Sequence, residues 1–260
     1  MLRGVYLENI TWKDAEEAFA RFDTVVIPLG AGLKEHGYHL PLNNDLLMAN
    51  YLTRRVTERL PVLVTPAIPY YFFPAFAEYP GSVSIEKDTA KNYVIDICRS
   101  LHAQGAKKFY VLNTGYSTIR ALEPARLELA KRRIQMEYTD FSGAKAEQVR
   151  ALAEQEGGTH ADEIETSIML YIAPEVVKLH LAEKDFHQEL DSAQPGPLTR
   201  DPQAKRGVYS PTGAYGDPTL ATREKGKLVV ETLVDDIVAF LEKFASPGYA
   251  PEPAREQWLR

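Results

Sequence analysis

The feature that most constrains this chain is the alternation of short apolar runs with longer segments in which apolar residues recur every three or four positions. The apolar runs predict strands over 24–30, 62–71 and 107–115, and residues 134–141 predict a further strand or extended piece. Because such alternation is typical of βαβ units, the sequence predicts an α/β fold with a mainly parallel sheet.

Helices are predicted where the apolar period is that of a helix face. They cover the ranges 45–60, 88–105, 120–133, 145–158, 159–174 and 222–244. Asp45 and Asp88 are placed to cap two of these helices, and Gly105 and Pro174 to end two of them. Residues 191–222 are rich in Pro, Gly and polar residues and show no period, so we expect a long loop that serves as a lid or a subunit contact.

Composition narrows the class of protein. The 260 residues, 45% of them hydrophobic and 25% charged, are ordinary for a globular chain, and we expect one domain over 1–245 and a polar tail over 246–260. The net charge is -6 and the basic residues form no stripe, which argues against nucleic acid as a partner. There is no apolar run near the roughly 18 residues of a membrane helix, and the N-terminus lacks a signal-peptide core. We therefore expect a cytoplasmic protein with no membrane partner.

Cys98 is the only cysteine, so no internal disulfide is possible. Its setting in a predicted helix favours a buried structural residue over a nucleophile, because nothing near it in sequence would lower the pKa of the thiol.

Polar and ionisable residues gather in three segments that leave predicted strands or begin a helix, which is where open α/β sheets bind ligands. The segments are Lys34, Glu35, His36, His39 and Asp45; then Asn113, Thr114, Tyr116 and Ser117; then His160, Asp162, Glu163 and Glu165. Imidazole and carboxylate together suit zinc or manganese, and such an ion can lower the pKa of bound water to about 7. The pattern is consistent with a hydrolase, although Asp45 could be only a helix cap.

The third segment has two interpretations. On a helix over 159–174, His160 and Glu163 would share one face, while Asp162 and Glu165 would share a neighbouring one. Alternatively, the carboxylates only decorate a helix N-terminus, where the helix dipole favours negative charge.

Five segments of the chain resemble the creatininase family, the creatinine amidohydrolases. They are GLKEHGYHLPLNND, YPGSVSI, LNTGYST, THADEIETS and YGDPTLATREKGK, in the order of the family's motifs. The resemblance implies a three-layer α/β/α sandwich, usually a homohexamer, and hydrolysis of cyclic amides or formamides at a two-metal site; some members act on cyclic polyol ketones. It places His36 and Asp45 at metal-ligand positions, with Asp45 bridging, and aligns His160 and Glu165 with the histidine and glutamate of the third motif.

The departures from the family pattern are also informative. Lys34 stands where the family has its first metal-binding glutamate, Gly115 where it has a histidine ligand, and Ser117 where creatininase has a glutamate ligand. Three of the five ligands that the resemblance implies are therefore missing. A two-metal centre like that of creatininase cannot form, and creatinine is a poor candidate substrate.

Two hypotheses follow. In the first, the chain hydrolyses a small polar amide, lactone or ketone with one divalent ion, zinc or manganese, and Lys34 supplies the charge of the missing ion. The residues assigned are Glu35, His36 and Asp45 for the metal; Lys34, His160, Glu163 and Glu165 for catalysis; and Ser82, Asn113 and Tyr116 for the substrate. Glu163 or Glu165 could replace Glu35 as the third ligand.

In the second hypothesis, the chain is an inactive binding or structural subunit of a homo-oligomer. We favour the first, because burying so many polar groups without a use for them would cost stability.

Overall fold

The computed structural model describes residues 3–140, 143–187 and 198–259. Five parallel strands form the central sheet in the order β1, β3, β2, β4, β5. The strands are β1 (Val5–Tyr6), β2 (Thr24–Leu29), β3 (Leu63–Val64), β4 (Lys108–Asn113) and β5 (Gln135–Tyr138). Every residue of the central strand β2 is buried, and β2 pairs with β4 along its full length. The predicted parallel sheet is confirmed.

Helices separate and follow these strands. They are α1 (Trp12–Arg21), α2 (Asn44–Arg59), α3 (Lys87–His102), α4 (Ile119–Lys131), α5 (Gly143–Arg150), α6 (Glu163–Ile172) and α7 (Arg223–Ala245). Short 3-10 turns are η1 (Leu7–Asn9), η2 (Pro74–Phe76), η3 (Pro174–Val176), η4 (Leu179–Leu181), η5 (Pro218–Leu220) and η6 (Glu256–Trp258). Two further short strands, β6 (Leu198–Thr199) and β7 (Val208–Tyr209), pair with each other.

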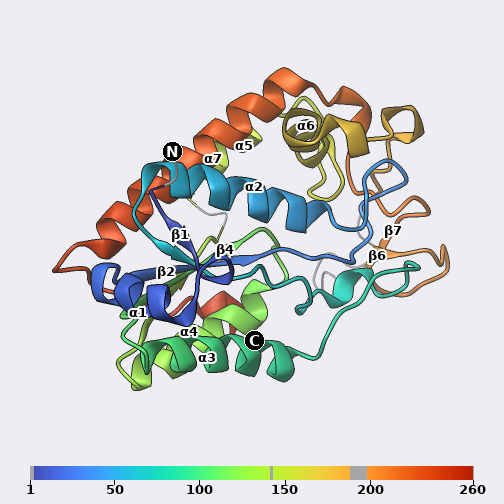
Figure 1. Ribbon diagram of the computed structural model, residues 1–260. Coiled ribbons are helices and arrows are strands. Elements are labelled where there is room, and N and C mark those ends of the chain that lie inside the picture. The colour runs from blue at the N-terminus through green and yellow to red at the C-terminus, as the bar shows by residue number, and fades with distance from the viewer. Residues whose placement is uncertain (1–2, 141–142, 188–197, 260) are drawn as a thin grey trace.

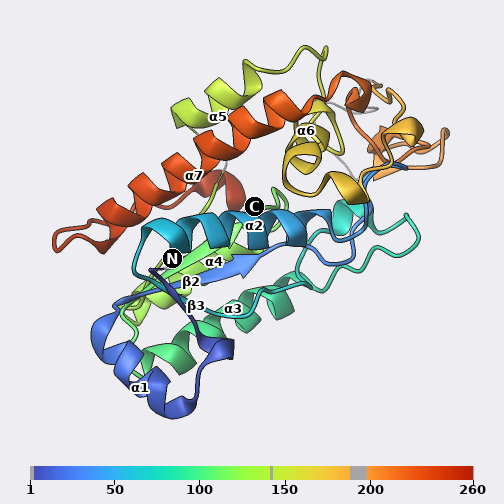
Figure 2. The ribbon, with the colours of Figure 1, turned by 45° about the horizontal axis from the view of Figure 1, so that its top comes forward.

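The sheet is the middle of three layers, as Figures 1 and 2 show. Side chains of a strand alternate between its two faces. Accordingly, Val25 and Ile27 of β2 pack in one core with α1, α3 and α4, whereas Val26 packs in a second core with α2, α6 and α7. This arrangement confirms the three-layer α/β/α sandwich.

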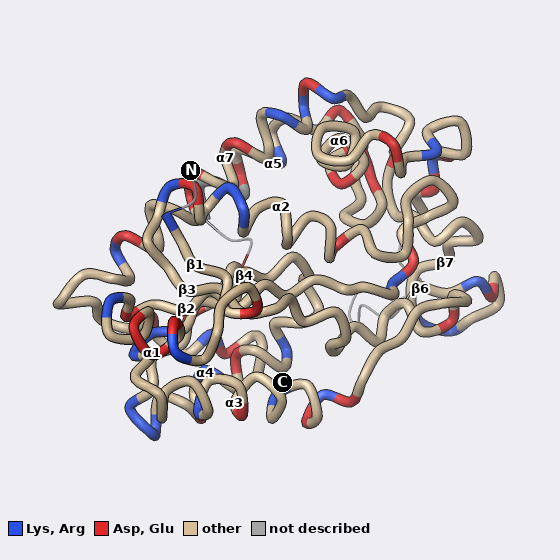
Figure 3. The backbone as a smooth tube through the Cα atoms, viewed as in Figure 1, with Lys and Arg blue, Asp and Glu red and all other residues tan. Residues whose placement is uncertain are grey.

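Charged residues of both signs are interspersed along the described parts of the chain (Figure 3). Within the described residues, no helix combines the length and the apolar character that a membrane crossing requires. Cys98 lies on the buried face of α3, and burial raises the pKa of its thiol.

Three predictions for the first half of the chain were wrong in detail. Asp45 does not cap α2: the helix begins at Asn44, and the carboxylate of Asp45 instead contacts Lys34 and His36. The strand predicted over 62–71 is limited to β3 and one bridge at Ile68, because the prolines of this segment have no N–H to donate to a ladder. The helix predicted over 88–105 forms as α3, but Asp88 lies in its first turn and pairs with Lys91.

Later boundaries also differ. The helix predicted over 159–174 begins only at Glu163, after the capping residue Asp162, so His160 and Glu163 do not share a helix face. The helix predicted over 145–158 ends at Arg150. The described part of the 191–222 loop contains β6, β7 and η5, and residues 191–197 lie outside the described residues.

Candidate active site

The site lies at the carboxyl end of β2, where residues 30–43 connect the strand to α2. Gly30 permits a close approach here, because a Cβ at this position would overlap the backbone carbonyl of Asp45. The hydroxyl of Thr114, from the loop after β4, donates to the same carbonyl at 3.0 Å. The end of β2 and the first turn of α2 are therefore in direct contact, which brings Asp45 back beside the residues that follow the strand.

Lys34 and Asp45 form a buried ion pair. The Lys34 Nζ lies 2.7 Å from the Asp45 Oδ2, and the two side chains are 7% and 2% exposed. Burial alone would lower the pKa of Lys34, but Asp45, with Glu165 and Glu35, raises it above its ordinary value. Burial likewise opposes ionisation of Asp45, yet Lys34 and His36 hold its pKa well below the usual range. Both groups are therefore charged at neutral pH.

His36 is fixed between two oxygen acceptors. Its Nδ1 lies 2.9 Å from the Lys34 carbonyl, and its Nε2 lies 2.9 Å from the Asp45 Oδ1. A neutral imidazole has one N–H, so both contacts are satisfied only by an imidazolium or by a cation between Nε2 and the carboxylate. A backbone carbonyl that accepts from one ring nitrogen is the usual way in which proteins aim the other nitrogen at a metal.

His160 reaches the same place from the segment before α6. Backbone hydrogen bonds with Tyr215 hold the residue, and its ring lies 4.3 Å from the ring of Phe76. The Nε2 lies 2.8 Å from the Glu35 Oε1, and the Nδ1 lies 3.7 Å from the Glu165 Oε2. Burial by itself lowers the pKa of His160, but the adjacent Glu35 carboxylate raises it above the ordinary value.

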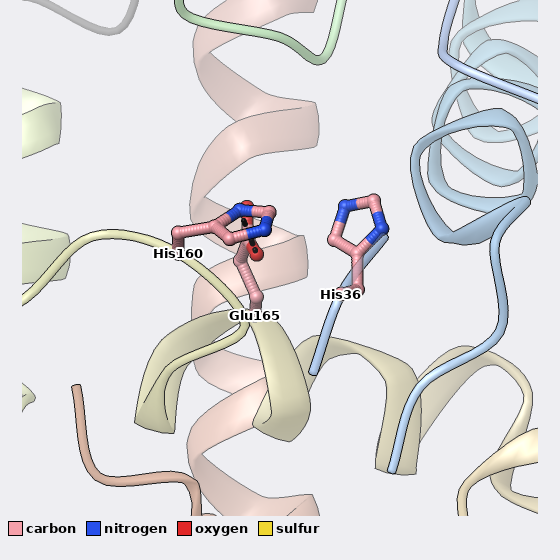
Figure 4. A group of neighbouring side chains, drawn as sticks. All are labelled: His36, His160 and Glu165. Atoms are coloured by element: carbon pink, nitrogen blue, oxygen red, sulfur yellow. Dashed lines mark ion pairs between the residues drawn. The ribbon is translucent and has the colours of Figure 1, made fainter. Parts of the chain in front are cut away.

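Three side chains converge on one point. The ligand atoms of His36, His160 and Glu165 all lie within 4.8 Å of one another. Figure 4 shows Glu165 rising from α6 to the ring of His160, with the ring of His36 facing them from the loop after β2. Two imidazoles and a carboxylate form a ligand set that suits a divalent transition metal.

Glu163 is not part of this group, although sequence reasoning assigned it a catalytic role. Its carboxylate accepts from the backbone N–H groups of Glu154 and Gln155, both at 2.8 Å, and pairs with Lys225. It is fully buried and joins the end of the 143–155 segment to α6 and α7. Asp162 caps α6 through the N–H groups of residues 164 and 165, and burial raises its pKa to about 6.

The residues predicted to bind substrate lie in different settings. Asn113 is buried and bonds to Gly115 and Thr118, so it shapes the loop after β4. The Ser82 hydroxyl accepts from the Glu35 N–H at 2.9 Å and so positions the loop after β2. Only Tyr116 presents a largely exposed ring, 64% accessible.

Sequence reasoning missed Phe76, whose ring packs on His160 and lies 4.7 Å from the Lys34 Nζ. Its sequence setting, FFPAF, gives no sign of a site residue. It also missed Gly213, which has a φ of +88° and lies so close to the Glu35 carboxylate that a Cβ would overlap it.

A cleft of about 1600 Å³ opens onto the cluster. Lys34, His160 and Glu165 line it, together with Tyr116 and the η2 segment. Lys34, His160 and Glu165 can therefore be reached by a small molecule that enters the cleft.

Fold and cluster together define an α/β/α sandwich protein with imidazole and carboxylate groups at the carboxyl end of its central strand. The chain matches the creatininase (creatinine amidohydrolase) family over residues 8–241 and belongs to that family of hydrolases.

Similar proteins differ in what their names say they act on. The chain is 30% identical to the creatinine amidohydrolase of Pseudomonas putida, covering 94% of this chain and 99% of that protein. It is 29% identical to a mycofactocin precursor peptide peptidase of Mycobacterium ulcerans, covering 86% of each. A solved structure described as "Creatininase Mn" has a TM-score of 0.75 at 26% identity and covers 94% of this chain and 100% of that one.

Proposed function

We propose that this creatininase-family hydrolase cleaves an amide C–N bond of a small polar substrate with the help of one divalent ion, manganese or zinc. The observation that carries the proposal is the convergence of His36, His160 and Glu165 beside the buried Lys34–Asp45 pair. A similar structure is described as a manganese form, and the names of two relatives describe an amidohydrolase and a peptidase, which supports both the metal and the bond.

The charge of the cluster favours one ion over two. Glu35, Asp45 and Glu165 are carboxylates and Lys34 is an ammonium, so the group carries two net negative charges when both imidazoles are neutral. One divalent ion neutralises these charges, whereas a second would leave a net positive charge in a largely buried site, which is costly. The ammonium of Lys34 lies beside Asp45, which the resemblance to creatininase identifies as the bridging carboxylate.

The ligand assignment differs in part from the one predicted. We propose His36, His160 and Glu165 as ligands, with the Asp45 Oδ1 close enough to His36 to join them. Glu35, predicted as a ligand, bonds to His160 and to the Gly37 N–H at 2.9 Å. In our proposal it orients the His160 ring. When bound, the ion would supply Lewis acidity for the substrate carbonyl and for a nearby water.

The chain's own residues supply the remaining chemistry. The Lys34 ammonium is held in one orientation by Asp45 and lines the cleft, so it can stabilise negative charge that develops on the substrate carbonyl oxygen. The Glu35 carboxylate lies 2.8 Å from the His160 Nε2 and would hold that ring in one orientation. The Phe76 ring covers one side of Lys34 and of His160 and keeps water from it.

The first test is the metal content of the purified chain and of His36→Ala and Asp45→Ala. We expect about one manganese or zinc ion per wild-type chain and loss of the ion in both variants. His102→Ala is the matched control, because His102 lies on α3 and its ring Nδ1 bonds to the Ala106 carbonyl, outside the cluster. A wild-type chain that stays metal-free after reconstitution would refute the metal-dependent mechanism.

The second candidate function is an inactive subunit with a binding or structural role. The absence of three ligands that the family resemblance implies favours it: Lys34, Gly115 and Ser117 stand in their places. A screen of lactams, linear amides, lactones and cyclic ketones separates the two. Metal-dependent turnover that disappears in His36→Ala supports the hydrolase, and a metal-loaded chain with no turnover supports the subunit.

A further inference from the structure

The C-terminal segment, residues 246–259, lies beyond the residues 8–241 that match the family. It was predicted to be a polar tail, yet it packs on the domain. Its last turn, η6, contacts α4, and Trp258 packs against the core beneath α3 and α4. Figure 1 shows the chain returning from the end of α7 to a C-terminus near α3 and α4.

Hydrogen bonds to a buried ion pair of α4 hold this segment in place. Arg126 pairs with Glu123 at 2.8 Å and donates to the backbone carbonyls of Glu252 and Pro253, both at 3.0 Å. The Arg255 N–H donates to the Glu123 carboxylate at 2.9 Å. Because Arg126 is itself buried, these backbone contacts satisfy donors that would otherwise lack partners, and the segment is therefore part of the folded structure.

The side chain of Arg255 extends toward the cleft. It lies over the ring of Tyr138 at 4.7 Å, and its Nε is 3.2 Å from the carboxylate of Asp140. Glu252, Arg255, Tyr138 and Asp140 all line the cleft that contains Lys34 and His160. The C-terminal segment thus forms part of the wall of the same cleft.

Trp258 supports a second part of that wall. Its ring meets the ring of Tyr116 edge-on, with centroids 4.8 Å apart and an interplanar angle of 77°. Tyr116 leaves the loop after β4, lines the cleft and is 64% exposed, so little else restrains it. An edge-on aromatic contact of this kind restricts a ring that would otherwise be mobile.

We propose that residues 252–258 form one wall of the substrate cleft and set its width, with Trp258 positioning Tyr116. That the cleft binds a substrate rests on the proposed function, whereas the contribution of residues 252–258 to its wall does not. A ring held in one place presents a flat apolar surface, which fits a planar amide or ring group of a substrate and disfavours bulkier ones.

The test measures access to the cleft without requiring turnover. Ser117 lines the cleft, and Ser117→Cys introduces a thiol there while the native Cys98 stays buried. Labelling rates of Ser117→Cys are compared for iodoacetamide, which is small, and for a maleimide attached to a polyethylene glycol chain, which is bulky. Each reagent is applied with Trp258 intact, with Trp258→Ala and with Trp258→Phe, and the chain without Ser117→Cys measures background from Cys98.

We expect Trp258→Ala to accelerate the bulky reagent by roughly three- to tenfold, the range for loss of one aromatic pair, and the small reagent much less. Trp258→Phe should restore the slow rate, because a phenyl ring can still meet Tyr116. Unchanged rates, or equal acceleration of both reagents, would overturn the proposal.

On any amide that the wild type hydrolyses, Trp258→Ala should raise KM and leave kcat and metal content unchanged. An inactive or metal-free chain that still shows size-selective labelling would refute the proposed function but support the wall.

Discussion

At the scale of single residues, the Lys34–Asp45 pair has the greatest influence on the site. A buried ion pair contributes little net stability compared with apolar packing, but removal of one partner leaves an uncompensated buried charge. Here the pair also holds Lys34, which replaces a metal-binding glutamate of the family, against Asp45. The carboxylate faces His36 with one oxygen and Lys34 with the other.

Lys34→Met keeps the length of the side chain and removes its charge. We expect a stability loss of about 3–5 kcal/mol, because Asp45 would keep only His36 as a partner, and a loss of turnover of at least about 100-fold. Chemical unfolding and steady-state kinetics would measure the two effects. The matched control is Lys107→Met, since the Lys107–Asp23 pair is exposed and should change stability by less than about 1 kcal/mol. Wild-type turnover in Lys34→Met would contradict the assigned role.

Glu163 and Glu165 lie two positions apart, and their contacts predict different outcomes. Glu165→Gln should weaken metal binding by about 10- to 100-fold with little loss of stability, because its side chain faces His160 and is partly exposed. Glu163→Gln should lower stability by about 1–3 kcal/mol, because its buried carboxylate accepts from two backbone N–H groups, and should leave metal affinity unchanged. Metal titration would measure the metal affinity of both variants, and urea unfolding would measure their stability. The same effect in both would contradict the structural distinction.

At the scale of elements, the contact between the end of β2 and the start of α2 determines the site. Close approach of the two backbones at Gly30 turns the chain so that Asp45, eleven positions after Lys34, returns to it. The three layers keep this junction rigid, because β2 is buried on both faces. A change at the junction should therefore affect stability and metal binding together.

Gly30→Ala tests this coupling. The added methyl group would overlap the Asp45 carbonyl, so α2 must shift, and we expect a loss of about 1–3 kcal/mol or more together with weakened metal binding. Gly248→Ala is the control, because a Cβ there meets nothing within 4 Å. Thermal unfolding and metal titration would be measured on both. Full metal affinity in a stable Gly30→Ala chain would show that the close approach is not needed.

At the scale of the whole molecule, the ion that we propose would link the loop after β2 to His160 and to α6. A ligand that binds only the folded state stabilises it, by about 2.7 kcal/mol at one hundred times its dissociation constant. We therefore expect a chelator to lower the melting temperature of the wild-type chain. His36→Ala should melt at the same temperature with and without chelator. An unchanged wild-type melting temperature would argue against a structural link through the ion.

Sequence patterns determined the architecture and the family, and left the individual roles open. The apolar runs predicted the sheet because burial on both faces requires continuous apolar residues. Cys98 was predicted to be buried from its setting in a predicted helix, and it is buried. Loop boundaries were less well predicted: His160 was assigned to a helix because the period of the following residues continued back through it. Helix ends depend on capping and local hydrogen bonds, which a periodic pattern does not record.

By itself, then, the sequence determined that this chain is an α/β/α sandwich of the creatininase family, with its polar groups on the loops that follow the strands. Only the tertiary structure decided which of those groups meet. Glu165 faces His160 while Glu163 faces Lys225, and Trp258, far from Tyr116 in sequence, packs on its ring. The physical reason is that periodicity reports burial, whereas the partner of a buried charge or an exposed ring is set by segments that only folding brings together.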